Sequence, residues 1–187
     1  MVNENWFDDY FKLYRASFSG DYLNKKLLDL KNRLVEVNKN KRKTIIAGNG
    51  GSAAIASHCA VDFTKNAGIR MIDFNEAGLI TCLSNDYGYA EWVSKAIEMY
   101  GDEGDLVILI SSGGRSENML NAAKTAKKIG IFVVTFTGFS EDNPLKNAGE
   151  LNFWIDSKAY NIIEMTHQIW LLAVCDAIIG KAEYPAS

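Results

Sequence analysis

The feature that most constrains the fold is a pair of continuous apolar runs, DLVILI at 105–110 and IFVVTF at 131–136, with a helical pattern between them. Strands that are apolar at every position are typical of a parallel sheet covered by helices on both faces. Shorter strand-like segments fall at 44–47, 70–74 and 151–155. Because strands and helices alternate along the chain, the sequence predicts an α/β fold with a doubly wound parallel sheet.

Helices are expected where apolar residues recur three and four positions apart. Such segments in the α/β part of the chain are 52–65, 89–100, 116–129 and 161–179. The apolar segment 77–83 fits either a strand or a helix. Two amphipathic helices fill the first forty residues, ahead of the first strand, and are therefore expected to pack outside the sheet or on another subunit.

Length, charge and cysteine usage exclude several classes of protein. The 187 residues suit one domain, and a formal net charge of −3 is too small for a dedicated nucleic-acid surface. No apolar run is expected to span a membrane, and the acidic N-terminal segment lacks the apolar core of a secretory signal. Cys59, Cys82 and Cys175 are far apart without CxxC spacing. We therefore expect reduced thiols in a cytoplasmic protein with no nucleic-acid or membrane partner.

A glycine-rich loop follows the first predicted strand, with Asn49, Gly50, Gly51 and Ser52 at its centre. Glycines let the backbone turn sharply, and the helix that follows directs free N–H groups and a positive dipole end toward the same place. This combination favours an anion site to which Ser52 adds a hydroxyl donor. The loop matches neither a Walker motif nor a strict GxGxxG. A tight turn that only begins a helix is the alternative.

A second polar loop follows the strand at 105–110 and brings together Ser111, Ser112, Ser116 and Asn118. Hydroxyls, glycines and a helix N-terminus suit a phosphate group that is held mainly by neutral donors. Ser116 fits equally well as the N-cap of the next helix. Two such loops, each after a buried strand, strengthen the prediction of a phosphate site. Between them Asp86 is expected to accept hydrogen bonds from sugar hydroxyls.

The motifs GNGGSAA, SNDYGY, SSGGRSENML and EMTHQIWLL together resemble the sugar isomerase (SIS) domain family, and within it the phosphoheptose isomerases. The likeness spans nearly the whole chain. It implies a flavodoxin-like sandwich in one SIS domain, 1–187, with oligomerisation helices at 1–40 and an α/β core at 41–187. It also implies a homotetramer with active sites between subunits, phosphate binding by Ser52, Ser111, Ser112 and Ser116, and sugar contacts from Asn49 and Asp86.

The catalytic positions of the family are only partly present in this sequence. His58 and Asp62 match a His and a Glu that the family places one helical turn apart. If Glu164 is aligned with the family's Glu on the last helix, Ile163 and Leu171 replace a Gln and a second His. In addition, Asn161 stands at an arginine position and Gly113 at a hydroxyl position.

A rebuilt acid–base set is conceivable on the last helix, because Glu164 and His167 are three residues apart and Gln168 follows. We predict Asp62 or Glu164 as the base and His58 or His167 as the acid. If zinc binds, the same four residues are the predicted ligands. A histidine buried in the core is the alternative for His167.

The predicted function is that of a ketose–aldose isomerase, most closely of sedoheptulose 7-phosphate, which supplies heptose for bacterial lipopolysaccharide or capsule. Two alternatives remain open from the sequence. One is a catalytically inactive binder, either a sugar-phosphate sensor or a scaffold of the type that binds the replication initiator DnaA. The other is an isomerase of a different sugar phosphate.

Overall fold

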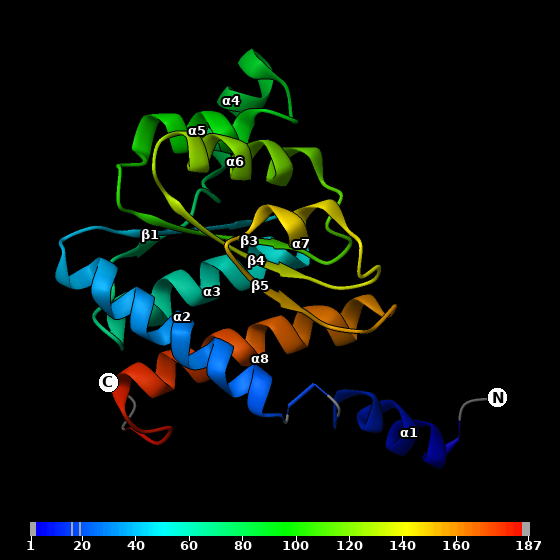
Figure 1. Ribbon diagram of the computed structural model, residues 1–187. Coiled ribbons are helices and arrows are strands. Elements are labelled where there is room, and N and C mark those ends of the chain that lie inside the picture. The colour runs from blue at the N-terminus through cyan, green and yellow to red at the C-terminus, as the bar shows by residue number, and fades with distance from the viewer. Residues whose placement is uncertain (1–2, 16, 19, 185–187) are drawn as a thin grey trace.

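A five-stranded parallel sheet in the order β2-β1-β3-β4-β5 lies between two layers of helices (Figure 1). The computed structural model describes residues 3–15, 17–18 and 20–184. The strands are β1 Thr44–Gly48, β2 Met71–Ile72, β3 Leu106–Ser111, β4 Phe132–Thr137 and β5 Leu151–Trp154. Every residue of β1 and β3 is buried, as expected for central strands covered on both faces. The predicted doubly wound parallel sheet is therefore confirmed.

The helices form two layers with separate apolar cores on the two faces of the sheet (Figure 1). One layer contains α2 Asp21–Lys39, α3 Gly51–Lys65 and α8 Tyr160–Ile179. The other contains α4 Ala77–Tyr87, α5 Trp92–Tyr100, α6 Glu117–Lys128 and α7 Pro144–Ala148. The ambiguous segment 77–83 is helical, and α7 was not expected from the sequence. The edge strand β2 has two residues rather than the predicted five.

The two N-terminal helices pack very differently. In α2, Leu30 and Leu34 are fully buried in the same core as α3 and α8. In contrast, α1 Glu4–Arg15 extends away from the sheet (Figure 1) and keeps Phe7, Phe11 and Leu13 more than half exposed. The predicted boundary at residue 40 is thus not a packing boundary, because α2 belongs to the α/β core. An oligomerisation role stays a prediction for α1.

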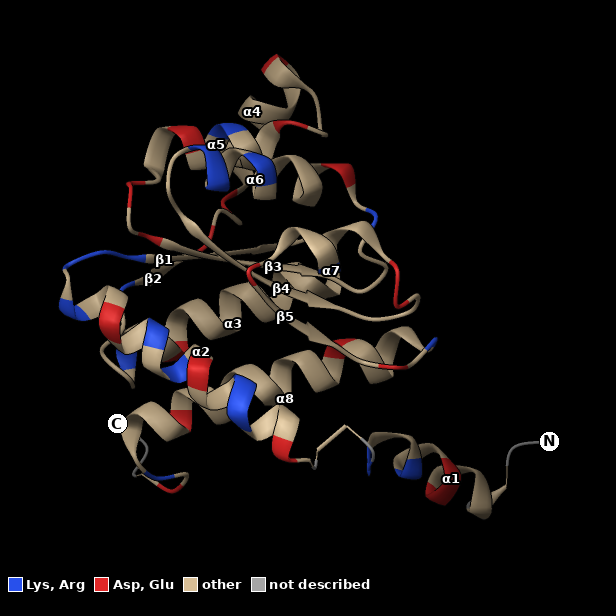
Figure 2. Cartoon of the chain, in the orientation of Figure 1, with Lys and Arg blue, Asp and Glu red and all other residues tan. Residues whose placement is uncertain are grey.

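The closing helix α8 is long and apolar enough to cross a membrane, which contradicts the expectation that no segment would reach that length. Its apolar side chains are used inside the fold, however, where Ile162, Ile163 and Leu171 pack in the core beneath the sheet. Figure 2 shows few charged residues along α3 and α8, while α2 carries both signs on its surface. Membrane-like composition here reflects a buried core helix.

The direction in which the chain winds reverses between the neighbouring strands β1 and β3. The chain winds from β1 outward to β2 in one direction, and from β3 to β4 and β5 in the other. The loops that follow β1 and β3 therefore diverge to opposite sides and leave a crevice at the carboxyl ends of these neighbouring strands. Ligands of open α/β sheets bind in such crevices. Both polar loops predicted from the sequence lie there.

Candidate sugar-phosphate site

A pocket of about 420 Å³ occupies this crevice, and we call it the serine pocket. Its lining residues are Asn49, Ser52, Ile110, Ser111, Ser112, Gly113, Arg115, Ser116, Tyr160 and Glu164. The structure thus brings together five of the residues predicted to bind phosphate or sugar, from two loops that are sixty residues apart in the chain. It adds Arg115, Tyr160 and Glu164 to them.

The hydroxyl groups of the serine pocket are directed at each other or left free, not used to cap helices. Ser116 occupies the N-cap position of α6 but makes no side-chain cap hydrogen bond. Its Oγ lies 3.2 Å from Ser111 Oγ. Ser112 Oγ is buried and, within the described residues, has no hydrogen-bond partner. A buried hydroxyl without a partner is costly, so this loop favours a ligand that accepts hydrogen bonds.

The first loop supplies the N-terminus of α3 to the same pocket. Gly50, at φ 56°, adopts a left-handed backbone conformation that glycine tolerates best, and it precedes the first residue of α3. Ser52 lies in the first turn of this helix and is buried. The unpaired N–H groups of a helix N-terminus favour an anion at this position.

Glu164 is the one acidic residue among the residues that line the serine pocket. Its carboxylate lies against Gly51, where a Cβ atom on Gly51 would collide with it. Glycine at position 51 therefore leaves room for the Glu164 carboxylate beside the first turn of α3, which a side chain there would displace. The predicted position of Glu164 within the site is consistent with this geometry, although the contact itself does not assign a role.

Arg115 is the only basic side chain among the described residues that line the pocket, and the sequence analysis did not select it. Its side chain is 65% exposed and its guanidinium approaches Asp142 at 3.9 Å. At that exposure the ion pair contributes little to stability, so the guanidinium is available to a ligand. Its position inside the SSGGRSEN loop is the signal by which the sequence could have identified it.

Asn49 and Asn118 form a reciprocal amide pair beside the pocket. Asn49 Nδ2 donates to Asn118 Oδ1 at 3.0 Å, and Asn118 Nδ2 donates to Asn49 Oδ1 at 2.8 Å. Tyr89 Oη also donates to Asn49 Oδ1, at 3.0 Å. Only Asn49 lines the serine pocket. Asn118, predicted to bind substrate, does not line this pocket, but it hydrogen-bonds to the Asn49 amide and holds that amide in place.

Asp86 does not lie in the serine pocket. It sits near the end of α4, which packs on α5 at the outer side of its layer (Figure 1). Its carboxylate accepts a hydrogen bond from Asn85 Nδ2 at 2.9 Å and lies 3.8 Å from Cys82 Sγ. Within one chain, the predicted contact between Asp86 and the sugar is therefore not formed, because α4 ends away from the β1–β3 crevice.

His58 and Asp62 form the predicted pair on α3, but neither lines the serine pocket. His58 Nε2 lies 3.1 Å from Asp62 Oδ2, one helical turn away. Gln168 Nε2, on α8, lies 2.7 Å from His58 Nδ1. Glu164 and Gln168 are one turn apart on α8, so the two helices face each other through Glu164, Gln168, His58 and Asp62. We call these four residues the polar row.

His167 is not part of the polar row, and its predicted role as an acid or metal ligand is wrong for this fold. The ring is fully buried, lies edge-on to Phe136, and hydrogen-bonds through Nε2 to the Thr137 carbonyl at 3.0 Å. Burial lowers the pKa of His167 to about 4, and the bond to Thr137 opposes this shift only weakly. The alternative of a core histidine is the correct one.

The proposed zinc ligands do not come together in the chain. In the described part of the sequence, no group of three or more His, Cys, Asp and Glu side chains is close enough to hold a metal ion. His167 faces the sheet, and both ring nitrogens of His58 contact side chains of the polar row. A zinc site requires three or four such ligands. Within one chain, the described residues bring no such set together.

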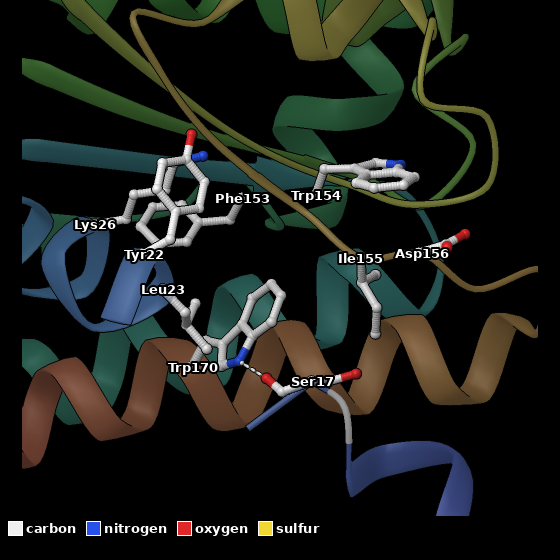
Figure 3. Close-up of a pocket in the computed structure, with 9 residues that line it drawn as sticks. All are labelled: Ser17, Tyr22, Leu23, Lys26, Phe153, Trp154, Ile155, Asp156 and Trp170. Atoms are coloured by element: carbon white, nitrogen blue, oxygen red, sulfur yellow. Dashed lines mark hydrogen bonds between the residues drawn. The ribbon is translucent and has the colours of Figure 1, made fainter. Parts of the chain in front are cut away.

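A second pocket, of about 250 Å³, lies between α2, β5 and α8 (Figure 3). Tyr22, Phe153 and Trp170 give it a mainly apolar wall. Two of its polar groups already have partners, because Lys26 donates to the Asn152 carbonyl and Trp170 Nε1 donates to a backbone carbonyl. This pocket lacks the convergent free donors of the serine pocket. The serine pocket is therefore the stronger candidate for the sugar-phosphate site.

Comparison with known proteins agrees with this geometry. Residues 15–138 match the SIS domain family. The phosphoheptose isomerase of Fusobacterium nucleatum is 30% identical over 173 residues, covering 90% of this chain and 89% of that protein. The phosphoheptose isomerase of Campylobacter concisus is 32% identical over 148 residues, covering 75% and 77%.

A solved structure extends the comparison to the fold. The phosphoheptose isomerase of Francisella tularensis superposes with a TM-score of 0.87 at 24% sequence identity, over 97% of this chain and all of that one. The fold match includes the sheet that carries the serine pocket. The chain therefore belongs to the SIS domain family, and within that family to the phosphoheptose isomerases.

Proposed function

We propose that this chain is a ketose–aldose isomerase that acts on a phosphorylated seven-carbon sugar, sedoheptulose 7-phosphate, and binds its phosphate in the serine pocket. The observation that carries the proposal is the buried Ser112 hydroxyl, which lines the pocket without a hydrogen-bond partner among the described residues. Ser111, Ser116, Arg115 and the N-terminus of α3 surround the same space. Together they offer donors to a phosphate and few groups that would repel one.

The acid–base pair that we assign is Asp62 with His58. Isomerisation moves one proton between the two adjacent carbons and another between their oxygens, which requires a base and an acid side by side. Asp62 Oδ2 and His58 Nε2 lie 3.1 Å apart, so a group that takes a proton lies next to one that gives a proton. In this assignment Asp62 carries the carbon-bound proton and His58 exchanges the hydroxyl proton. Glu164 is the competing base.

We further propose that pocket and pair serve one sugar across a subunit boundary. Asp62 is ten residues beyond Ser52 on α3, which is about 15 Å along the helix axis. From the phosphorus to the second carbon, a heptose 7-phosphate spans at most roughly 10 Å. A sugar whose phosphate lies in the serine pocket thus reaches Asp62 more readily from a second copy. The partly exposed aromatic side chains of α1, among them Trp6 and Phe11, support assembly into a homotetramer.

The place of the reaction follows as part of the proposal. A heptose 7-phosphate is a precursor for bacterial lipopolysaccharide or capsule, and we place the enzyme in the cytoplasm. The three cysteines of the chain are free thiols, as expected in a reducing compartment.

The test is turnover of a panel of ketose phosphates, followed by NMR in deuterated buffer. We expect aldose product, and deuterium at the carbon beside the carbonyl, from sedoheptulose 7-phosphate and much less from hexulose or pentulose phosphates. Preference for a shorter sugar would replace the substrate. Binding of sedoheptulose 7-phosphate without product or exchange would contradict the enzyme and favour a sensor or scaffold, for which the buried Ile163 and Leu171 are the specific argument.

A further inference from the structure

Gln168 takes up a contact that neither the sequence pattern nor the family relationship assigns. Its Nε2 lies 2.7 Å from His58 Nδ1, and this bond joins residues 110 positions apart in the chain. The neighbouring helix positions 163 and 171, where the resemblance places polar groups, are Ile163 and Leu171, both fully buried in the core. Gln168 is therefore the residue of α8 that reaches His58.

The partners of His58 determine which ring nitrogen carries the proton. Asp62 Oδ2 lies 3.1 Å from Nε2, and a carboxylate oxygen repels the lone pair of a bare ring nitrogen, so this contact favours hydrogen on Nε2. In the neutral ring Nδ1 is then an acceptor, and the Gln168 amide donates to it. The two contacts together favour a single tautomer of His58, with hydrogen on Nε2 and none on Nδ1.

The arrangement continues beyond His58. Asn66 Nδ2 donates to the other Asp62 oxygen, Oδ1, at 3.4 Å, so that Asp62 is approached by neutral donors on both sides. His58, Asp62 and Asn66 are spaced four residues apart on one face of α3. A row of polar contacts therefore runs from Gln168 through His58 to Asp62 and Asn66.

We propose that Gln168 is a positioning residue that holds His58 in the Nε2–H tautomer with this proton directed at Asp62; the inference rests on the proposed role of the His58–Asp62 pair. Without the Gln168 donor the ring is free to place its proton on Nδ1 and to rotate, because His58 is about half exposed. The carboxylate would then lose its donor in a fraction of molecules. Gln168 contacts no sugar in this assignment and acts only through His58.

The experiment compares the full-length wild-type protein with Gln168→Leu and Gln168→Glu. Leucine removes the donor at similar size, and glutamate replaces the donor by an acceptor. Imidazole ¹⁵N spectra report the tautomer directly and need no turnover. The chain has only two histidines, so buried His167 is an internal reference that neither variant should move. Met165→Leu, on the exposed part of α8, is the matched control.

We expect the wild-type spectrum to show His58 as Nε2–H. Gln168→Leu should show mixed tautomers, and Gln168→Glu should show hydrogen on Nδ1, because a carboxylate at position 168 can only accept. With the preferred sugar, Gln168→Leu should lower kcat about 3- to 10-fold, the loss of one hydrogen bond, with KM within about twofold. Gln168→Glu should not restore it.

An unchanged His58 spectrum and unchanged kcat in Gln168→Leu would overturn the inference. A change in KM alone would also overturn it, because it would mean that Gln168 contacts the sugar. If no sugar is turned over by the wild type but the tautomer depends on Gln168, then the proposed function fails while the positioning of His58 stands.

Discussion

The serine pocket and the polar row share Glu164 but are built from different kinds of structure. The pocket takes its polar groups from two loops that each follow a buried strand, and from backbone N–H groups at the start of α3. The row takes its groups from the facing surfaces of α3 and α8. The loops are fixed by the sheet, whereas the row depends on which face of α8 each residue occupies.

Phosphate binding and proton transfer are therefore expected to depend on different parts of this fold. A phosphate site made of hydroxyls and backbone amides is preserved as long as the β1–β3 crevice is preserved. In the proposed assignment Gln168 supports His58 from α8, while positions 163 and 171 hold the buried apolar residues Ile163 and Leu171. The two regions should therefore respond differently to mutation.

The largest effect should come from Asp62→Asn. It removes the assigned base and should lower kcat by about 10²- to 10⁴-fold with little change in KM. Glu164→Gln should lower kcat by less than about 10-fold, because the Glu164 carboxylate is assigned no proton transfer. Steady-state kinetics on sedoheptulose 7-phosphate measures both. The reverse order of the two variants would assign the base to Glu164.

The two histidines give the next largest contrast, in stability. Burial lowers the pKa of His167 from its ordinary value of 6.5 to about 4 in the folded chain, so the unfolded chain binds a proton first as pH falls. The contribution of neutral His167 to the free energy of unfolding is complete above pH 6.5. It falls by about 3 kcal/mol as the pH is lowered from 6.5 to 4. Urea unfolding at several pH values should show this loss.

The control for that measurement is a pair of variants. His167→Gln should flatten the dependence on pH between 6.5 and 4, even if it lowers stability overall. His58→Gln should leave the slope nearly as in the wild type, since His58 is exposed and buries no imidazole. Equal flattening by both variants would contradict the distinction between a core and a site histidine.

Ser112→Ala tests the pocket. Loss of a hydroxyl that donates to a phosphate should raise KM about 10- to 100-fold, with a small change in kcat. Ser57→Ala, a serine on α3 that does not line the serine pocket, is the matched control and should leave KM unchanged. If Ser112→Ala lowers kcat and leaves KM alone, the loop does not hold the phosphate in the ground state.

Tyr89→Phe should give the smallest effect. Among the described residues, the Tyr89 hydroxyl hydrogen-bonds only to the Asn49 amide, and Asn118 holds the same amide independently. We expect KM to rise roughly 2- to 5-fold, less than the full value of one hydrogen bond. An effect as large as that of Ser112→Ala would mean that Tyr89 contacts the sugar itself.

Much of the fold and of the pocket could be predicted because the signals are local. Continuous apolar runs marked β3 and β4, and a cluster of glycine and serine after a strand marked each loop of the crevice. Arg115 was within reach of the same reasoning, since it lies inside the second loop. Helix α7 was missed because five residues give no periodicity to detect.

Three residues of the polar row, His58, Asp62 and Glu164, were predicted from the sequence, but the contact of Gln168 with His58 was not, because it depends on helix rotation. Positions 167 and 168 differ by about 100° around α8, which is enough to send His167 into the core and Gln168 toward His58. The distance of Asp86 from the pocket has a similar cause, since it depends on how α4 packs on α5. Sequence spacing identifies a face, but packing decides which face is inside.

The most direct test of the central claim, that the serine pocket and the His58–Asp62 pair act on one sugar from two subunits, is subunit complementation. Co-expressed Asp62→Asn and Ser112→Ala chains should recover about a quarter of wild-type activity at low substrate concentration, although each variant alone is weak. Wild type mixed with the double variant should give the same quarter. No recovery in the first mixture, with about half of the activity in the second, would place the whole site in a single chain and contradict the claim.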